Sequence, residues 1–464
     1  MLNRRRRGAA IAGAVLAGVL TVSIGSSIGQ VPPAHAAGLG AGGEYHPLTP
    51  ARIFDTRSPG INSTSGAIPT SSTGGSVDVH ILGQGGIPAS SSDVLAVAIN
   101  ITVDKPTSKG YLQVYPTGST TGISSVLNFS AGQTVPNLTV LTVGSGGNIT
   151  VKLVTPTAGT GDVLIDVFGW FSTSNFATSG ARLIPVGPAR IYDSREPSFN
   201  PTAQPLGQTD VVRVPIRGAD AQNPTVTDVV PSSPDVVGVV LNVTGINDQT
   251  GSTNTFVSVL PENPTGPVTT SNLNLVPGQV KANLVIVPVT NADGAIRLYN
   301  NAGKTHLAVD VVGYMLANQN PVTKLGRVIP LTSPFRAFDT REASFGGAQL
   351  GSGQAESWSF SQFVSSVTLD GQPVGNEIAL LGNLTGTGLS RVYPTAPVAS
   401  YFTLYPSDAP SRPLSSNINV TEGVNLAVAN MAVVKLGADD QIKAYNNAGN
   451  IHYLFDVSAV VLQD

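Results

Sequence analysis

Hydrophobic and polar residues alternate along most of the chain that follows residue 36. In "GYLQVYP", Leu112 and Val114 fall on one face of an extended segment, and Tyr111, Gln113 and Tyr115 fall on the other. The segments "GGSVDVHIL" and "VVRVPI" alternate in the same way. Gly, Pro and Asn interrupt this pattern roughly every 8–12 residues. After residue 36, no segment of about 12 or more residues shows the 3.6-residue period of a helix. The pattern therefore predicts antiparallel strands joined by tight turns.

The same pattern occurs three times. "PARIFDTR" returns as "PARIYDSR" and "PFRAFDTR". Each copy continues with an apolar strand that has a central asparagine, then a strand that ends in proline, and it closes on an apolar strand that carries an aspartate. The residues of these landmarks are Asp55, Asp193 and Asp339 with Arg57, Arg195 and Arg341 in the opening motif, Asn100, Asn242 and Asn383, and the closing Asp166, Asp310 and Asp456.

These landmarks recur roughly 140 residues apart, which is the length of a domain and too long for a solenoid repeat. We therefore expect an all-β protein of three tandem antiparallel β-sandwich domains of about 135–145 residues each. The expected bounds are 45–175, 181–317 and 325–464. The connectors between them are short, so we expect the domains to be closely strung.

The first 36 residues have the pattern of a secretory signal. A basic segment, "MLNRRRR", precedes an apolar run of small and aliphatic residues, and "AHA" forms a cleavage site that predicts processing after Ala36. Residues 37–44 are then an N-terminal linker. A retained membrane anchor is the alternative, and the choice between the general and twin-arginine export routes stays open. No later stretch is apolar for long enough to span a membrane, so we expect an extracellular protein without membrane contact after cleavage.

Composition narrows the class further. The chain has no cysteine, so each domain must be held by its hydrophobic core and not by disulfides. Only 11% of the residues are charged and the net charge is −3, which argues against nucleic acid or an anionic membrane as a partner.

The set "PARIFDTR", "INITV", "GYLQVYP", "LNFSAGQTVPNL" and "IDVFGWF" resembles a repeat module of exported actinobacterial surface and cell-wall proteins. That module stands in tandem or beside a catalytic domain such as a cell-wall hydrolase or peptidase. The resemblance covers the chain from about residue 45 to its end, through landmarks that recur in order. It implies an exported, all-β, surface- or wall-associated protein and supplies no catalytic residues.

The recurring aspartates have two interpretations. Asp55 and Arg57 share one face of a strand, and an arginine fork can satisfy a buried carboxylate. The motif therefore predicts a structural ion pair, which the closing Asp166 is placed to join. Alternatively, Asp55 and Asp166 are paired carboxylates for glycosidic hydrolysis or metal binding. Pairing with arginine lowers a carboxylate pKa, whereas a general acid needs a raised one. We therefore favour the structural interpretation and expect no catalytic residue.

Other chemistry is weakly represented in the sequence. His306 and His452 both lie four residues before a closing aspartate, but the first copy has no histidine there, which favours a structural role. We find no nucleophile elbow, no metal-ligand spacing and no phosphate-binding loop, so we expect no metal and no cofactor.

One strand face carries aromatic and polar residues that suit a sugar. Rings that flank a polar group can stack on a sugar face while the polar group binds a hydroxyl. The candidate glycan platforms are Tyr111, Gln113 and Tyr115 in the first copy and Tyr401, Thr403 and Tyr405 in the third. The equivalent Phe256, Ser258 and Leu260 lack the second ring, and packing against a neighbouring strand or domain is the alternative for all of them.

The sequence thus predicts a non-catalytic, exported protein of the cell surface or cell wall that binds glycan or acts as a structural or adhesive module. The expected partners are cell-wall or extracellular glycan, or surface proteins, and self-association is possible through strand edges. The alternative is a polysaccharide or cell-wall hydrolase that uses the recurring aspartates.

Overall fold

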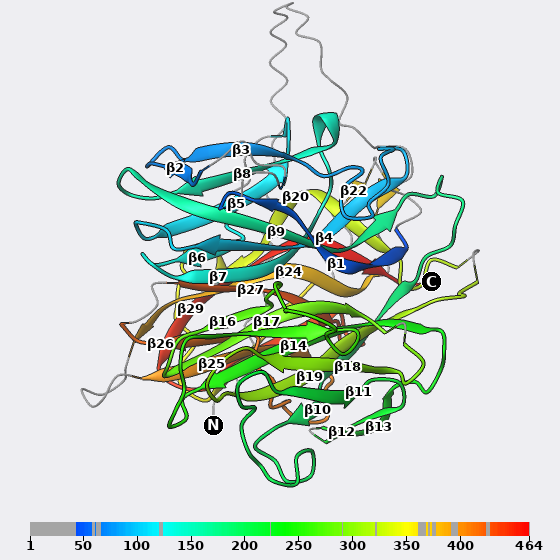
Figure 1. Cartoon of the computed structure of the whole chain (residues 1–464), viewed down its shortest axis with the longest axis vertical. Helices are drawn as coiled ribbons and strands as arrows, with labels where there is room; N and C mark the ends of the chain where they lie inside the picture. The colour runs from blue at the N-terminus through cyan, green and yellow to red at the C-terminus, as the bar shows by residue number, and fades with distance from the viewer. Residues whose placement is uncertain are drawn as a thin grey trace, which may run out of the picture.

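The chain is all-β and antiparallel, as expected (Figure 1). A computed structural model describes residues 43–57, 61, 66–119, 124–222, 224–289, 291–320, 323–360, 368–369, 372–373, 377–390, 398–423 and 427–463. The expected signal peptide with its cleavage site after Ala36, and most of the expected linker, lie outside these residues. In the part that is described, helical structure is limited to two short 3₁₀ turns, and none of it has the length and hydrophobicity needed to cross a bilayer.

In the first repeat two sheets share one hydrophobic core. The central sheet has the strand order β1 (Tyr45–Asp55), β9 (Gly159–Ser172), β4 (Val94–Asp104) and β7 (Thr134–Leu141), with β2 (Ile68–Thr70) also pairing with β9. The outer sheet has the order β3 (Gly75–His80), β8 (Asn148–Val154), β5 (Gly110–Pro116) and β6 (Leu127–Phe129).

The second and third repeats keep this strand order. The second has the central strands β10 (Arg182–Asp193), β19 (His306–Leu316), β14 (Val236–Asn247) and β17 (Gln279–Pro288), and the outer strands β11 (Val211–Pro215), β18 (Ala295–Asn300), β15 (Thr255–Leu260) and β16 (Leu273–Leu275). The third has the central strands β20 (Val328–Asp339), β29 (Asn450–Leu462), β24 (Glu377–Ser390) and β27 (Ala427–Lys435), and the outer strands β21 (Gln354–Ser359), β28 (Gln441–Asn446), β25 (Ala399–Pro406) and β26 (Ile418–Thr421). Two-stranded ribbons are added in the second repeat, β12 (Ala219–Gln222) with β13 (Thr225–Val230), and in the third, β22 (Thr368–Leu369) with β23 (Gln372–Pro373).

Each central sheet is buried on both faces. Every residue of β4 is buried. Val97 and Ile99 point into the core of their own repeat, whereas the alternate residues Ala96 and Ala98 belong to a second cluster. Burial on both faces explains why the sequence of β4, "VLAVAINITVD", is almost continuously apolar and does not alternate as a one-sided strand does.

That second cluster, the central core, contains residues of all three repeats. It includes Leu138 of β7, Leu284 of β17 and Met431 of β27, and these three edge strands contact one another. The repeats therefore close around a shared core and are not strung along a line. The expectation of closely strung domains did not include this shared core, because it left out the second apolar face of each central sheet, which the other repeats cover.

Asparagines close the central core in a cyclic order. The amide nitrogen of an asparagine on one edge strand donates to the amide oxygen of an asparagine on the next repeat's inner strand. The donor–acceptor pairs are Asn137 to Asn383 at 3.0 Å, Asn430 to Asn242 at 3.3 Å and Asn283 to Asn100 at 3.5 Å. We call these six residues the asparagine ring. Its three hydrogen bonds link the first repeat to the third, the third to the second, and the second to the first.

The inner-strand asparagines of this ring also form a second set of hydrogen bonds between repeats. Their amide nitrogens donate to carbonyl oxygens just before the short strands β6, β16 and β26: Asn383 to Ser125 at 2.6 Å, Asn100 to Ser271 at 3.2 Å and Asn242 to Ser416 at 2.5 Å. These short strands contact the edge strand of the neighbouring repeat in the same cyclic order. Each repeat is thus joined to both others by buried amide hydrogen bonds.

Charged residues join the starts of the three repeats. Glu44 accepts hydrogen bonds from Arg182 at 3.1 Å and is paired with Arg327 at 3.3 Å. Arg182 is only 1% exposed, and it also donates to backbone oxygens in the second connector, from Nη2 to Asn320 and from Nη1 to Thr323. Glu44, which the sequence assigned to a linker, is therefore part of the contact between repeats.

The asparagine ring gives a prediction with an internal control. The side-chain oxygens of Asn137 and Asn430 accept from the backbone nitrogens of Met431 and Leu284, at 3.0 and 3.1 Å, whereas that of Asn283 has no partner among the described residues. Replacing Asn137 or Asn430 by Ala should lower the free energy of unfolding by about 2–4 kcal/mol, because buried groups lose their partners. Asn283→Ala should cost about 1 kcal/mol less, since it leaves one fewer backbone group unpaired.

Urea unfolding followed by tryptophan fluorescence measures these differences. The control is Asn254→Ala, because Asn254 is exposed, and this variant should match the wild type. Equal losses for the exposed control and the ring variants would show that the ring does not hold the repeats together.

Glu377 gives a second prediction. It begins β24, is 3% exposed, and neither of its carboxylate oxygens has a partner among the described residues. Burial raises its pKa to about 7. The register of the central sheets places Val94 and Val236 at the equivalent positions in the other repeats, since Val94, Val236 and Glu377 lie opposite Ser172, Leu316 and Leu462 respectively.

Because the folded pKa of Glu377 lies above the ordinary value of 4.5, the folded state holds a proton that the unfolded state releases. Stability should therefore fall as the pH rises from 4.5 to above 7. Glu377→Val should remove this slope and make the protein more stable than the wild type at pH 8. Urea unfolding between pH 4.5 and 8 checks this, with the exposed Glu262→Val as control. Parallel curves for wild type and Glu377→Val would contradict it.

Candidate functional site

The opening motif forms an ion-pair network in the first repeat. Arg52 binds Asp166 with two bonds, from Nε to Oδ1 at 2.9 Å and from Nη2 to Oδ2 at 3.0 Å, and reaches Asp55 with Nη1 at 3.2 Å. Arg57 binds Asp55 from the other side at 3.1 and 3.0 Å and also reaches Asp104 at 3.0 Å. The two carboxylates of the motif are thus bridged by one arginine and held by a second.

The same network occurs in the other two repeats. Arg190 bridges Asp310 and Asp193, which Arg195 also binds, and Arg336 bridges Asp456 and Asp339, which Arg341 also binds. From the sequence, the second arginine of the motif (Arg57 in the first repeat) was predicted to pair with the aspartate. The first arginine (Arg52), which bridges the two carboxylates, was not predicted. The signal was present, because an arginine stands three residues before the aspartate in all three copies.

The network lies on the face of the central sheet that meets the other repeats. Arg52, Asp166 and Asn100 are directly opposite one another on β1, β9 and β4, so they share the face of the asparagine ring. Arg190 additionally donates to the carbonyl oxygen of Leu414 in the third repeat at 3.0 Å. The motif therefore flanks the contact between repeats.

Electrostatics in the network differ between the two carboxylates. Burial raises the pKa of Asp55, but the bonds from Arg57 and the charge of Arg52 outweigh it and hold the pKa below its usual value; the same balance holds for Asp193 and Asp339. For Asp166, burial dominates over the bonds from Arg52 and raises the pKa. Asp55 and Asp166 are 2% and 1% exposed, and all four of their oxygens accept hydrogen bonds from arginine.

The histidines are also bound within the protein. His306 Nδ1 lies 2.9 Å from Ser194 Oγ, and His452 Nδ1 lies 3.2 Å from Thr340 Oγ1. Ser194 is fully buried, and its hydroxyl also accepts from the backbone nitrogen of Leu307 at 2.9 Å. Burial lowers the pKa of His306. These contacts join the end of the opening motif to the closing strand.

The residues of the candidate glycan platforms are partly buried. Thr403 has no exposed surface and donates to the carbonyl oxygen of Ser415 at 2.5 Å, and Gln113 is 8% exposed. Tyr405 is buried as well, and Tyr401 packs near Tyr445, over which Arg412 lies at 4.1 Å. The prediction that a polar group between two rings faces outward fails at Gln113 and Thr403, because the segments before β6 and β26 cover them.

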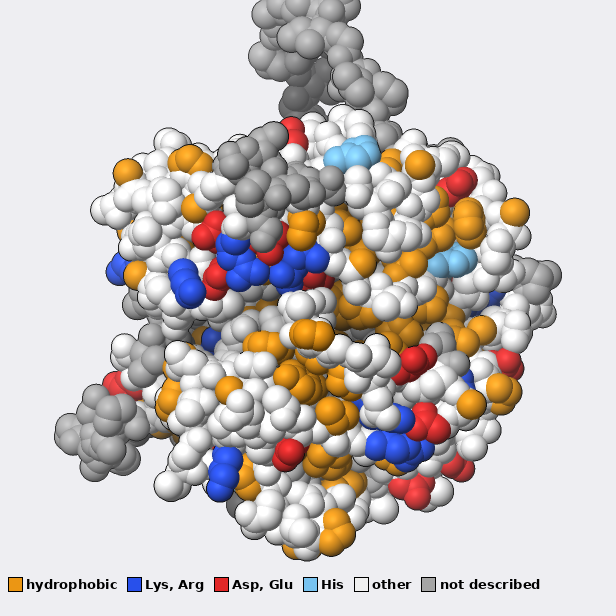
Figure 2. Space-filling model, viewed as in Figure 1, with side chains coloured by type: hydrophobic (Ala, Val, Ile, Leu, Met, Phe, Trp, Pro, Cys, Tyr) orange, Lys and Arg blue, Asp and Glu red, His pale blue; other side chains and the backbone are white. Residues whose placement is uncertain are grey.

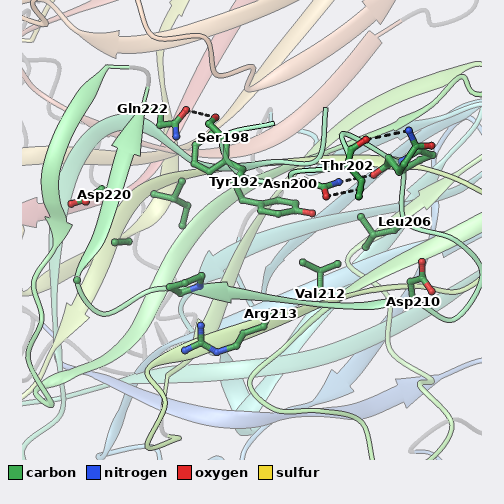
Figure 3. Close-up of a pocket in the computed structure, with 17 residues that line it drawn as sticks. Tyr192, Ser198, Asn200, Thr202, Leu206, Asp210, Val212, Arg213, Asp220 and Gln222 are labelled. Carbon is green, nitrogen blue, oxygen red and sulfur yellow. Dashed lines mark hydrogen bonds between the residues drawn. The ribbon is translucent and has the colours of Figure 1, made fainter. Parts of the chain in front are cut away.

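A cleft in the second repeat combines rings with polar groups that have remaining hydrogen-bonding capacity (Figure 3). Its volume is about 610 Å³, and β10, the segment 198–206, β11 and β12 form its walls. Tyr192 is 6% exposed and lies 6.4 Å from the ring of the half-buried Phe199. In the described part of the chain the hydroxyl of Tyr192 has no hydrogen-bond partner, and burial raises its pKa to about 12, so it is a neutral donor at physiological pH.

Polar side chains surround these two rings. Asp210 and Asp220 each accept one backbone hydrogen bond, from Gly207 at 2.6 Å and from Asp228 at 2.9 Å, and each keeps a second oxygen for another donor. The oxygen of Gln222 accepts from Ser198 at 2.7 Å, which leaves its amide nitrogen available. Among the described residues, no group of three or more His, Cys, Asp or Glu is placed to hold a metal ion.

Sequence reasoning missed this cleft. It depends on the ribbon β12–β13, which follows β11 and forms one wall. The segment "RGADAQNPTVTDVV" that builds the ribbon has no counterpart of equal sequence in the other repeats, so a search for recurring landmarks does not find it. The feature of this segment that could have indicated a binding site is its concentration of Asp, Asn and Gln.

On the face shown in Figure 2, acidic and basic side chains lie in mixed clusters, and hydrophobic side chains gather along the waist between the upper and lower halves. A large patch of one charge sign is not seen on this face. This surface gives no electrostatic footprint for a polyanion.

The comparisons with known proteins assign the chain to no family. No family model matches the chain, and no curated protein matches it. Among solved structures it is similar to a protein of Sulfolobus turreted icosahedral virus, at 11% identity and a TM-score of 0.15 over 91% of this chain and 92% of the other. A chain described with the triple jelly-roll fold and turret assembly of an archaeal virus has 11% identity and a TM-score of 0.15, covering 90% and 91%.

The tandem CBM22-1–CBM22-2 domain of Xyn10C from Paenibacillus barcinonensis has 13% identity and a TM-score of 0.17, covering 58% of this chain and 99% of the other. Similarities at this level carry no argument about function. The chain is an all-β protein of several antiparallel sheets, and its function has to be inferred from its own residues.

The ion-pair network gives a prediction that separates structure from catalysis. Asp166→Asn removes the carboxylate that the partly buried Arg52 binds with two bonds, so the free energy of unfolding should fall by about 3–5 kcal/mol. Asp55→Asn, which affects Arg52 and Arg57, should also destabilise the fold. Urea unfolding measures both, and the exposed Asp293→Asn serves as control, since a surface ion pair contributes little. Variants that keep wild-type stability but lose a polysaccharide-hydrolysing activity of the wild type would instead make these carboxylates catalytic.

Proposed function

We propose that this chain is a non-catalytic, exported protein of the cell surface or cell wall that binds a neutral glycan in the second-repeat cleft. In this proposal its repeats are three β-sandwich domains with the bounds 45–175, 181–317 and 325–464, and residues 1–36 direct export. The observation that carries the proposal is the hydroxyl of Tyr192, which has no hydrogen-bond partner among the described residues and lies beside the ring of Phe199 in a cleft of about 610 Å³.

The chemistry of the cleft suits a sugar. A pyranose presents an apolar C–H face and a ring of hydroxyls, and aromatic rings beside carboxylate and amide groups complement both. Tyr192 and Gln222 supply donors, and Asp210 and Asp220 supply acceptors. The nearby Arg213 is paired with Asp293 at 3.0 Å, so the cleft has spare negative charge, which disfavours an anionic polymer.

Export is supported by the leader pattern at residues 1–36 and by the resemblance of the repeats to modules of exported actinobacterial surface proteins. The absence of cysteine means that stability outside the cell rests on packing, to which the central core contributes.

The alternative function, a hydrolase that uses the recurring aspartates, has weaker support. General acid catalysis needs a carboxyl group that reaches the substrate, and both aspartates of the network are buried and bound to arginine. A structural or adhesive role without a glycan ligand is the second candidate. It is favoured by the closed arrangement of the repeats, which makes one compact unit of three modules.

Binding to insoluble and soluble polysaccharides tests the proposal. The mature chain should be retained on at least one neutral wall or extracellular polysaccharide, with cell-wall fractions, arabinogalactan, chitin and cellulose as the panel. Tyr192→Phe removes only the hydroxyl and should weaken binding about 5-fold, the equivalent of one hydrogen bond, without unfolding the protein. Asp220→Asn, on the exposed ribbon, should weaken binding similarly.

The matched control is Tyr314→Phe, which removes a hydroxyl from a half-buried tyrosine of the same repeat that does not line the cleft. It should bind as the wild type does. Failure to bind any member of the panel favours the structural role. Equal affinity of wild type and Tyr192→Phe for a retained polysaccharide moves the site away from the cleft.

A further inference from the structure

A second cavity lies where the three repeats meet. Its volume is about 270 Å³, and it lies at the beginning of the three edge strands, next to the asparagine ring. The first repeat contributes Tyr111 and Val135, the second contributes Lys281, and the third contributes Asn419 and Val428. We call it the axial cavity. It shares no lining residue with the second-repeat cleft.

We propose that the axial cavity binds an amphipathic organic anion, a medium-chain carboxylate, whose head group pairs with Lys281. This site is independent of the proposed glycan cleft. The argument rests on the position of Lys281, on the lack of a counter-charge around it among the described residues, and on the hydrocarbon that forms part of the lining.

Lys281 occupies a position that is apolar in the other repeats. It stands two residues before Asn283 on β17, just as Val135 stands two residues before Asn137 on β7 and Val428 before Asn430 on β27. The register is equivalent, since Asn100, Asn242 and Asn383 lie opposite the residue after the edge-strand asparagine in each sheet. Packing of the edge strands therefore does not require a charge at this position.

The charge of Lys281 has no counter-charge. Its Nζ donates to the carbonyl oxygen of Asn274 at 3.3 Å, and in the described part of the chain it forms no ion pair. Among the residues that the structure describes, no acidic one lines the cavity, and Lys109 is the other charged residue that does. Burial lowers the pKa of Lys281 to about 8, so it is largely protonated at pH 7. An ammonium group in such surroundings is stabilised when an anion comes next to it.

The remaining lining decides the body of the ligand. Phe129, Leu273, Ala427 and Ala429 line part of the cavity with hydrocarbon, beside polar residues such as Gln133. Phe129 and Leu273 are already buried, so an apolar chain or ring would cover mainly the partly exposed Ala427 and Ala429, which is favourable. A fully polar anion such as phosphate would leave this surface in contact with water. The combination of the Lys281 ammonium group with this hydrocarbon selects a ligand with one anionic end and an apolar body.

Calorimetry with sodium decanoate tests the site on the whole mature chain. Decanoate should bind and raise the melting temperature, because a ligand that binds only the folded state stabilises it. Binding should weaken between pH 7 and pH 9.5, as Lys281 loses its proton. Decanol, which has the same chain without the charge, should bind more weakly than decanoate and show no such pH dependence.

The variant Lys281→Val installs the residue type of the equivalent positions and should reduce decanoate affinity by about 10-fold or more, while decanol affinity is unchanged. Lys281→Met provides a second variant if Val disturbs the strand, and the exposed Lys304→Met is the control, which should bind as the wild type does. Lys109→Met should change affinity far less than Lys281→Val. Equal decanoate affinity of wild type and both Lys281 variants would overturn the proposal, as would the absence of decanoate binding to the wild type.

Discussion

The second apolar face of each central sheet is the constraint on which the rest of this structure depends. A sheet that packs only against the outer sheet of its own repeat would leave residues such as Ala96, Leu138 and Val140 in water, and these residues belong to the central core instead. Hydrophobic burial favours contact but does not set its geometry. The asparagine ring sets it, because each buried amide has partners only when the edge strands meet in one register. The fold therefore needs all three repeats, although each also has a core of its own.

Covalent linkage of the repeats allows their shared centre to be asymmetric. In a trimer of identical subunits, any residue near the axis would be present three times, and three ammonium groups around one cavity would repel one another. Here one lysine, Lys281, stands with Val135 and Val428, and one glutamate, Glu377, stands where the other repeats have Val94 and Val236. Such single substitutions reduce symmetry without opening the core. They are the positions at which a fused trimer can acquire a ligand site that a homotrimer lacks.

The sequence predicted the repeats, the antiparallel strands and the pairing of aspartate with arginine, because these depend on local alternation and on charges close together in the chain. It did not predict how the repeats meet. The almost unbroken apolar run in "VLAVAINITVD" is typical of a strand buried on both faces, and it was interpreted as a strand of a single sandwich. The platform at Gln113 and Thr403 failed for a related reason: alternation tells which residues share a face but not what covers that face. The cleft at Tyr192 depends on the ribbon β12–β13, which no repeat-based comparison reveals.

The buried Arg–Asp network is best understood through register. Arg52, Asp166, Asn100 and Leu138 lie opposite one another across the four strands of the first central sheet, and the same row recurs in the other repeats. A slip of one residue in any strand would move a charged or amide side chain to the face that packs in the sandwich core, where it would have no partner. Wrong strand pairings are therefore strongly destabilised. Replacing such a network by apolar residues can preserve stability, but it would remove this penalty. The recurrence of the motif in all three repeats follows from that role, since each repeat must align the same row before its asparagine can reach the next repeat.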